Sequence, residues 1–102
     1  DYIYVGDVAD AVVAAVQSDL SDHPDPVFNV STGNETSVNQ LLTEMNQALE
    51  TEVPARYAPA RAGDVRRSCL DPARARESLG WEAGVSTAEG LRHTLEFFRD
   101  RV

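Results

Sequence analysis

The sequence has no lysine and only one cysteine, Cys69, among its 102 residues. One cysteine cannot form a disulfide within the chain, and it does not by itself identify the compartment. A reducing cytoplasm is the default expectation. No run of about 18 apolar residues occurs, and the first residues lack the basic and long apolar regions of a signal peptide. We therefore expect no membrane span and no signal peptide.

Basic charge is also scarce. The nine basic residues are all arginine and face seventeen acidic residues, which gives a net charge of −8. Such a surface repels the phosphates of nucleic acids and anionic lipid head groups, so neither nucleic acid nor membrane is an expected partner. A salt-adapted source and a GC-rich genome both produce this composition, and the sequence leaves the two open.

The motifs of a self-contained catalytic centre are missing as well. No glycine-rich phosphate loop follows a strand-like run, no cluster of metal ligands occurs, and no Ser/His/Asp or Cys/His set has supporting context. The two histidines, His23 and His93, lie in a proline-rich loop and in a helical segment. We therefore predict no catalytic residue and no metal site in this chain.

What remains is an ordinary globular composition, 42% hydrophobic and 25% charged. Apolar residues at helical spacing, with cap residues ahead of them, predict helices over residues 8–20, 38–49, 72–79 and from 87 onward. Runs rich in β-branched and aromatic residues predict strands over 2–5, 27–31, 55–58 and 67–70. The order β-α-β-α-β-(β)-α-α predicts an α/β fold.

Several single residues have local structural interpretations. Asp7 is an N-cap candidate, Ser37 with Gln40 and Ser86 with Glu89 form capping boxes, and Asp71 caps a helix that has Pro72 as its first residue. Two further predictions concern aromatic and thiol side chains. Trp81 is expected to anchor the core beneath the last two helices, and Cys69 is expected to be an inert small hydrophobe within a strand.

The tetrapeptide Arg61-Ala62-Gly63-Asp64 is the most informative local cluster. An arginine fork beside a flexible glycine turn can grip a phosphate with two hydrogen bonds, and a carboxylate three residues later can accept hydrogen bonds from sugar hydroxyls. The alternative is a solvated surface loop with a local ion pair. From the tetrapeptide alone the alternative is favoured, because short motifs often recur by chance.

Three other side chains each allow two interpretations. Tyr2 and Tyr4 would share one side of a strand, where covering the core is favoured over forming a ligand platform. Asn29 lies in an apolar run, and a buried amide needs partners. Its side chain is therefore expected either to bond to the backbone or to face a site.

Taken in order, the motifs resemble the C-terminal part of the NAD-dependent epimerase/dehydratase family, the extended short-chain dehydrogenases, and among them UDP-glucose 4-epimerases. They span nearly the whole chain: Asp1-Tyr2-Ile3-Tyr4-Val5-Gly6-Asp7-Val8-Ala9, Phe28-Asn29-Val30-Ser31-Thr32-Gly33, Thr36-Ser37-Val38, Arg61-Ala62-Gly63-Asp64, Asp71-Pro72-Ala73-Arg74-Ala75 and Leu79-Gly80-Trp81. The resemblance implies a small mixed C-terminal substrate-binding lobe over residues 1–102, with the Rossmann half absent. It departs from the family at Ser31, where glycine is common, and at Arg74, where lysine is common.

The resemblance also implies residue roles. Arg61 matches the arginine that contacts the diphosphate of a nucleotide-sugar, Asp64 matches the acid that contacts the ribose, and Tyr2 matches an aromatic position near the nucleotide. The family's NAD fingerprint and its catalytic Tyr-x-x-x-Lys belong to the N-terminal half, and this chain has no lysine. NAD is thus implied for a parent enzyme, with no cofactor bound by this chain alone.

Two functional hypotheses follow. The first is the nucleotide-sugar-binding portion of such an enzyme, silent by itself and completed by the N-terminal Rossmann half. The second is a stand-alone, non-catalytic binding or interaction module derived from that family. Residues 27–31 would expose an apolar strand edge in an isolated chain, which predicts marginal stability or self-association.

Overall fold

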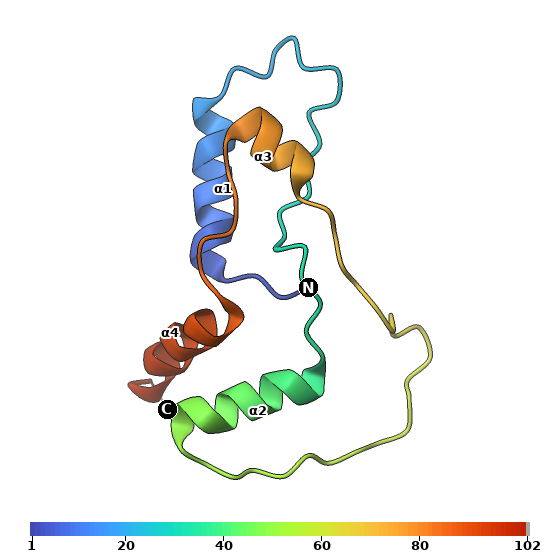
Figure 1. Ribbon diagram of the computed structural model, residues 1–102, viewed down its shortest axis with the longest axis vertical. Coiled ribbons are helices and arrows are strands. Elements are labelled where there is room, and N and C mark those ends of the chain that lie inside the picture. The colour runs from blue at the N-terminus through green and yellow to red at the C-terminus, as the bar shows by residue number, and fades with distance from the viewer. Residues whose placement is uncertain (102) are drawn as a thin grey trace.

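The computed structural model describes residues 1–101, and four helices joined by extended segments make up this part of the chain (Figure 1). The helices are α1 (Val5–Gln17), α2 (Val38–Leu49), α3 (Ala73–Leu79) and α4 (Thr87–Arg99). Their order and approximate positions agree with the helices predicted from apolar periodicity. No helix in residues 1–101 combines the length and the apolar character needed to cross a membrane.

The predicted α/β class is not confirmed, because residues 1–101 contain no β-strand. The runs 2–5, 27–31, 55–58 and 67–70 are extended or irregular, apart from Val5, which begins α1. A strand needs a neighbour with which to exchange backbone hydrogen bonds. Residues 29–31 instead bond through side chains, from Asn29 Nδ2 to the Asp71 carbonyl (3.2 Å) and from Ser31 Oγ to the Leu70 carbonyl (3.0 Å).

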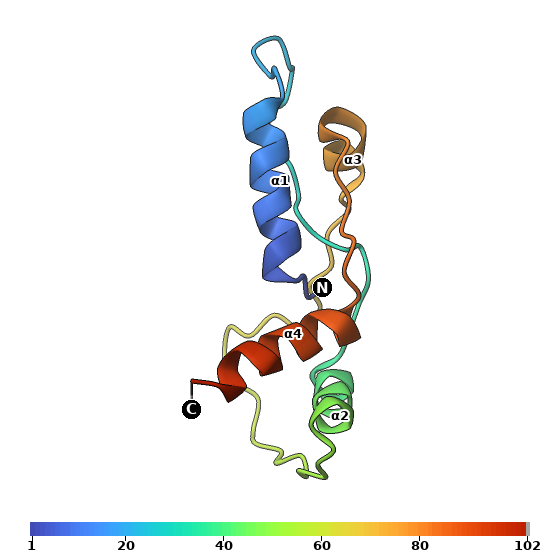
Figure 2. The same cartoon turned by 90° about the vertical axis from the view of Figure 1, so that its left-hand side faces the viewer.

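The helices form two contacting pairs, α1 with α3 and α2 with α4, which lie at opposite ends of the molecule (Figures 1 and 2). Between α2 and α3 the chain runs as a wide open arc. Helix α4 packs closely against the N-terminal segment at Gly90. A methyl group there would lie 3.1 Å from the Tyr4 Cβ, so only glycine fits without a shift of its neighbour.

The core lies between α1 and α3 and consists of three buried residues, Ala11, Ala75 and Trp81. Other apolar residues pack against it while partly exposed: Ile3, Ala14, Phe28, Val30, Leu79 and Ala83. The prediction that Trp81 anchors the last two helices holds for α3 and was wrong for α4. Trp81 shares its buried cluster with Ala11 of α1 and Ala75 of α3, whereas α4 belongs to the other helix pair.

The molecule is more extended than a compact domain of its length. Its Cα radius of gyration is 16.6 Å, whereas about 13 Å is typical of 100 residues in one compact domain. The face of α1 turned away from the core carries Val5, Val12, Val13 and Val16, all exposed. An apolar stripe of this kind usually marks a surface that another element covers.

The capping predictions had mixed outcomes. The Ser37–Gln40 box is confirmed, since Ser37 Oγ accepts from the Gln40 N–H (3.1 Å) and Gln40 Oε1 accepts from the Ser37 N–H (2.7 Å). At α4, Ser86 Oγ accepts from the Glu89 N–H at 3.2 Å, which is one of the two bonds of a box.

Two other helix starts differ from the prediction. Helix α1 begins at Val5 with Tyr4 in the cap position, so the assignment of Asp7 as N-cap was wrong. Pro72 itself occupies the cap position of α3, so the helix begins at Ala73, one residue later than predicted, and Asp71 Oδ1 accepts from the Ala73 N–H at 3.0 Å. Helix α1 also ends at Gln17, three residues before the predicted end.

Candidate functional site

The candidate phosphate-binding cluster lies in the exposed segment between α2 and α3. Arg61 Nε is 3.3 Å from Asp64 Oδ2, and the two side chains are 86% and 60% exposed. The Asp64 N–H donates to the Arg61 carbonyl at 3.3 Å, and Gly63 takes a left-handed φ of +87° that favours glycine. The geometry is that of a surface turn with a local ion pair, and it leaves the guanidinium open to solvent.

Tyr2 lies apart from this turn, at a cavity of about 520 Å³. The cavity lies between the N-terminal segment, the start of α2 and the chain that follows Asp64. Its lining residues are Asp1, Tyr2, Glu35, Thr36, Ser37, Val38, Val65, Arg66, Arg67 and Ser68. The structure thus brings Tyr2 beside the residues that immediately follow Asp64, while Arg61 and Asp64 themselves do not line the cavity.

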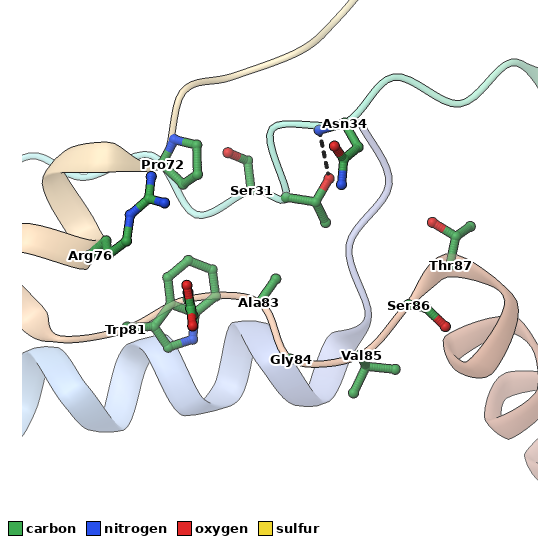
Figure 3. Close-up of a pocket in the computed structure, with 12 residues that line it drawn as sticks. Ser31, Asn34, Pro72, Arg76, Trp81, Ala83, Gly84, Val85, Ser86 and Thr87 are labelled. Atoms are coloured by element: carbon green, nitrogen blue, oxygen red, sulfur yellow. Dashed lines mark hydrogen bonds between the residues drawn. The ribbon is translucent and has the colours of Figure 1, made fainter.

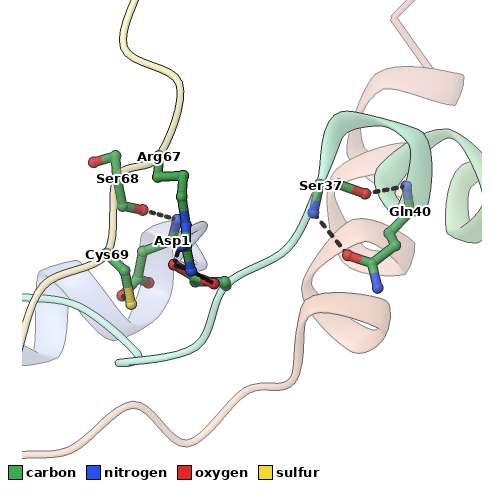
Figure 4. Close-up of polar contacts among 7 residues, drawn as sticks. Asp1, Ser37, Gln40, Arg67, Ser68 and Cys69 are labelled. Atoms are coloured by element: carbon green, nitrogen blue, oxygen red, sulfur yellow. Dashed lines mark hydrogen bonds and ion pairs between the residues drawn. The ribbon is translucent and has the colours of Figure 1, made fainter.

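Arg67 makes the tightest ion pair around this cavity, with Glu35. Its Nη2 lies 2.7 Å from Glu35 Oε1 and 2.6 Å from Oε2, and its Nε lies 3.1 Å from Oε1 (Figure 4). Hydrogen bonding to Arg67, and then the charge of Arg67, lower the pKa of Glu35. Hydrogen bonding to Glu35, and then the charge of Glu35, raise the pKa of Arg67. Sequence reasoning missed this pair. The signal was four arginines within residues 56–67 of a strongly acidic chain.

Asp1 fixes the position of its neighbour Tyr2. Asp1 Oδ1 accepts from the Thr32 N–H (3.0 Å) and hydroxyl (2.7 Å), and Oδ2 accepts from the Gly33 N–H (2.9 Å). Gly33 has a left-handed φ of +78°, so the turn that offers these donors needs a residue tolerant of that conformation. The carboxylate therefore holds the Tyr2 segment against the turn at residues 32–33.

Tyr2 and Tyr4 do not share one face of a strand, as the sequence suggested. Tyr2 remains exposed at the cavity, while Tyr4 packs onto α4, with its ring centroid 5.7 Å from that of His93. Asn29 is tied to the backbone at the Asp71 carbonyl, which was one of its two predicted outcomes. Cys69 lies in a segment without strand structure, so its placement within a strand was wrong; it is exposed, with Sγ 3.7 Å from Asp1 Oδ2.

A second cavity, of about 230 Å³, lies among residues 31–34, α3 and the segment that leads into α4 (Figure 3). Arg76 and Glu82 contribute opposite charges to its lining, and Trp81 forms part of its wall. None of the three predicted site residues lines it. It is therefore separate from the candidate nucleotide site.

The described residues offer neither a metal site nor a site for the diphosphate of NAD. Within residues 1–101 no three His, Cys, Asp or Glu side chains come together as a metal site. None of the helices in this range follows a glycine-rich turn, and the first turn of α1 instead buries the acidic Asp7. These residues do not fit the diphosphate of NAD, which binds at glycine-rich helix N-termini.

The chain belongs to the NAD-dependent epimerase/dehydratase family. A family profile described as GDP-mannose 4,6 dehydratase matches residues 1–94. The UDP-glucose 4-epimerase of Mycolicibacterium smegmatis is 45% identical over 101 residues, which are 99% of this chain and 31% of that protein. The UDP-glucose 4-epimerase of Bacillus subtilis is 37% identical over 81% of this chain and 24% of its own length.

Solved structures agree with the sequence relatives. The UDP-glucose 4-epimerase of Thermotoga maritima, crystallised with UDP-glucose, matches 99% of this chain and 31% of its own with a TM-score of 0.88 at 43% identity. The enzyme of Stenotrophomonas maltophila, with NAD and a formylated UDP-arabinopyranose, gives a TM-score of 0.88 at 35% identity over 99% of this chain and 30% of its own. The chain thus spans about a third of the length of these proteins and corresponds to their C-terminal part.

Proposed function

We propose that residues 1–102 are the nucleotide-sugar-binding portion of an NAD-dependent epimerase of the UDP-glucose 4-epimerase kind, and that they are silent without the rest of such an enzyme. The observation that carries the proposal is the match over 99% of the chain, with a TM-score of 0.88, to an epimerase that holds UDP-glucose. The subclass is supported by 45% identity to another protein of that name.

The proposed binding chemistry uses the turn at residues 61–64. The Arg61 guanidinium is 86% exposed and pairs with Asp64 through a single 3.3 Å contact. An exposed pair of this kind is worth at most about 1 kcal/mol, so a diphosphate that offers two charge-assisted hydrogen bonds displaces the carboxylate readily. Asp64, once released, accepts hydrogen bonds from the ribose hydroxyls.

Tyr2 is proposed to lie against the nucleotide at the mouth of the 520 Å³ cavity. The ring is 43% exposed, and its segment is held by the bonds of Asp1 to the turn at residues 32–33. Such a ring can pack on a base without a change of backbone. Together the three residues bind and orient the part of the substrate remote from the reacting sugar, which raises the rate by positioning.

The chain supplies no group for proton transfer in this proposal. It has no lysine, so a Tyr-x-x-x-Lys pair cannot lie within it. In such an enzyme the nicotinamide supplies redox chemistry at the sugar, and both it and the tyrosine belong to the segment that this chain would pack against. The exposed valines of α1 form the surface that we propose packs against that segment. A cytoplasmic location is also proposed.

A hybrid enzyme tests the proposal. Residues 1–102 replace the matching segment of the M. smegmatis epimerase, which shares 45% identity over 101 residues. We expect the hybrid to interconvert UDP-glucose and its C4 epimer, while the same enzyme without this segment does not. A folded, NAD-loaded hybrid without epimerase activity would overturn the proposal and favour the interaction-module hypothesis.

A further inference from the structure

The Glu35–Arg67 ion pair joins two segments of the chain at the Tyr2 cavity. The partners are 32 residues apart, and Arg67 presents two nitrogens to the two carboxylate oxygens at 2.6–3.1 Å. This pair is bidentate, with two guanidinium nitrogens bonded to both carboxylate oxygens. The pairs Arg61–Asp64 and Arg92–Glu96 are single contacts. Two-pronged pairing fixes orientation as well as distance.

Few bonds to other elements fix the loop that carries Arg61 and Asp64. Residues 51–70 are all exposed, and within residues 1–101 the hydrogen bonds of the turn at 61–64 are to one another. On its N-terminal side the nearest side-chain bond to another element is the long one from the Tyr57 hydroxyl to Asn39 Oδ1 (3.4 Å). On its C-terminal side Arg67, three residues from Asp64, is the first residue whose side chain pairs outside the loop. The next residue, Ser68, accepts a 2.6 Å hydrogen bond at its carbonyl from the Asp1 nitrogen.

Both parts of the candidate site attach to one short stretch of chain. Asp1, next to Tyr2, bonds to Thr32 and Gly33, and Arg67, close to Asp64, bonds to Glu35. The stretch 32–35 leads directly into the capping box of α2, which stiffens its end. The 32–35 stretch is thus a common support from which the spacing between Tyr2 and the arginine turn is set.

We propose that Glu35 and Arg67 are positioning residues, which hold the arginine turn at the distance from Tyr2 that a nucleotide diphosphate spans. Neither contacts the nucleotide in this proposal, which rests on the proposed function for the identity of the ligand. The pair orders the loop before binding, so less conformational entropy is lost when the nucleotide binds. Loss of either partner leaves Arg61 and Asp64 present and free to move.

The first test needs no nucleotide. Backbone ¹⁵N relaxation of the hybrid enzyme measures the order of residues 61–68 with the unsubstituted segment, with Glu35→Gln, with Arg67→Gln and with the reversed pair Glu35→Arg and Arg67→Glu. We expect both single variants to increase fast motion in this loop and the reversed pair to restore order. Glu96→Gln, which breaks an exposed pair on α4, is the control. Equal loop order in the parent and in both single variants would overturn the proposal.

The second test measures UDP affinity by calorimetry in the NAD-loaded hybrid. We expect each single variant to weaken UDP binding by about fivefold, the double Gln variant to add nothing further, and the reversed pair to recover affinity. A purely structural surface pair would leave the affinity unchanged, and that result would overturn the positioning role. If the parent hybrid binds no UDP, the proposed function fails, while the relaxation experiment still decides whether the pair orders the loop.

Discussion

The indole N–H of Trp81 donates a 3.0 Å hydrogen bond to the backbone carbonyl of Asp7, which ties the chain after α3 to the first turn of α1. The Asp7 carboxylate extends this link, since it accepts from the Gly84 N–H (3.2 Å) and the Val85 N–H (3.0 Å). Asp7 and Trp81 are each only 5% exposed. A buried carboxylate is thus matched by two backbone donors, and one residue joins the core to the segment that enters α4.

We predict that Asp7→Ala destabilises the chain severely. The substitution removes two charge-assisted hydrogen bonds and leaves two N–H groups without their acceptor, at a cost of about 2–4 kcal/mol in the free energy of unfolding. Urea denaturation followed by the fluorescence of Trp81 measures the change. The matched control is Asp10→Ala on the exposed side of the same helix, with an effect of about 0.5 kcal/mol or less. Equal effects at the two positions would contradict the role given to Asp7.

The exposed valines of α1 predict self-association of the isolated chain. Val12 and Val16 are 60% and 80% exposed on one face, and a contiguous apolar surface without a cover associates in water. We expect the chain to form oligomers in light scattering and the double variant Val12→Glu, Val16→Glu to be monomeric with its helices intact. Gln17→Glu adds a charge beside this face as a control and leaves the oligomers in place. A parent chain that is monomeric at high concentration would contradict this prediction.

The Glu35–Arg67 pair predicts a defined pH dependence. Arg67 lowers the pKa of Glu35, first through its hydrogen bonds and then through its charge. Because the pKa in the folded chain lies below that in the unfolded chain, the pair contributes fully above the ordinary glutamate pKa and is lost as the pH falls through the lowered value. A carboxyl ¹³C titration should show the Glu35 pKa rising in Arg67→Gln. It should stay unchanged in Arg56→Gln, and a rise in both variants would assign the shift to general charge instead.

The sequence predicted those features that depend on nearby residues. Apolar periodicity located all four helices of residues 1–101, and the Ser37–Gln40 box formed with both bonds because its partners are three residues apart. Asp7 was misjudged because aspartate serves equally well as a cap and as a buried acceptor. Which role it takes depended on Gly84 and Val85, which are distant in sequence.

The failures share a cause, which is dependence on partners far along the chain or outside it. Residues 27–31 have strand composition, but no segment among residues 1–101 offers them a backbone ladder. At the site, the tetrapeptide gave the ion pair of Arg61 with Asp64 correctly as one alternative. It could not reveal the cavity or the Glu35–Arg67 pair, because these arise where segments more than thirty residues apart meet.

The proposed binding of a nucleotide-sugar through the turn at residues 61–64 can be tested by one titration. Calorimetry measures UDP binding to the NAD-loaded hybrid and to its Arg61→Ala variant, with Arg56→Ala as the matched control from the same loop. Loss of a bidentate arginine–phosphate contact costs about 1.5–3 kcal/mol, so we predict UDP binding at least about tenfold weaker in Arg61→Ala. Arg56→Ala should bind as the parent does. Equal UDP affinity in the parent and in Arg61→Ala would contradict the account.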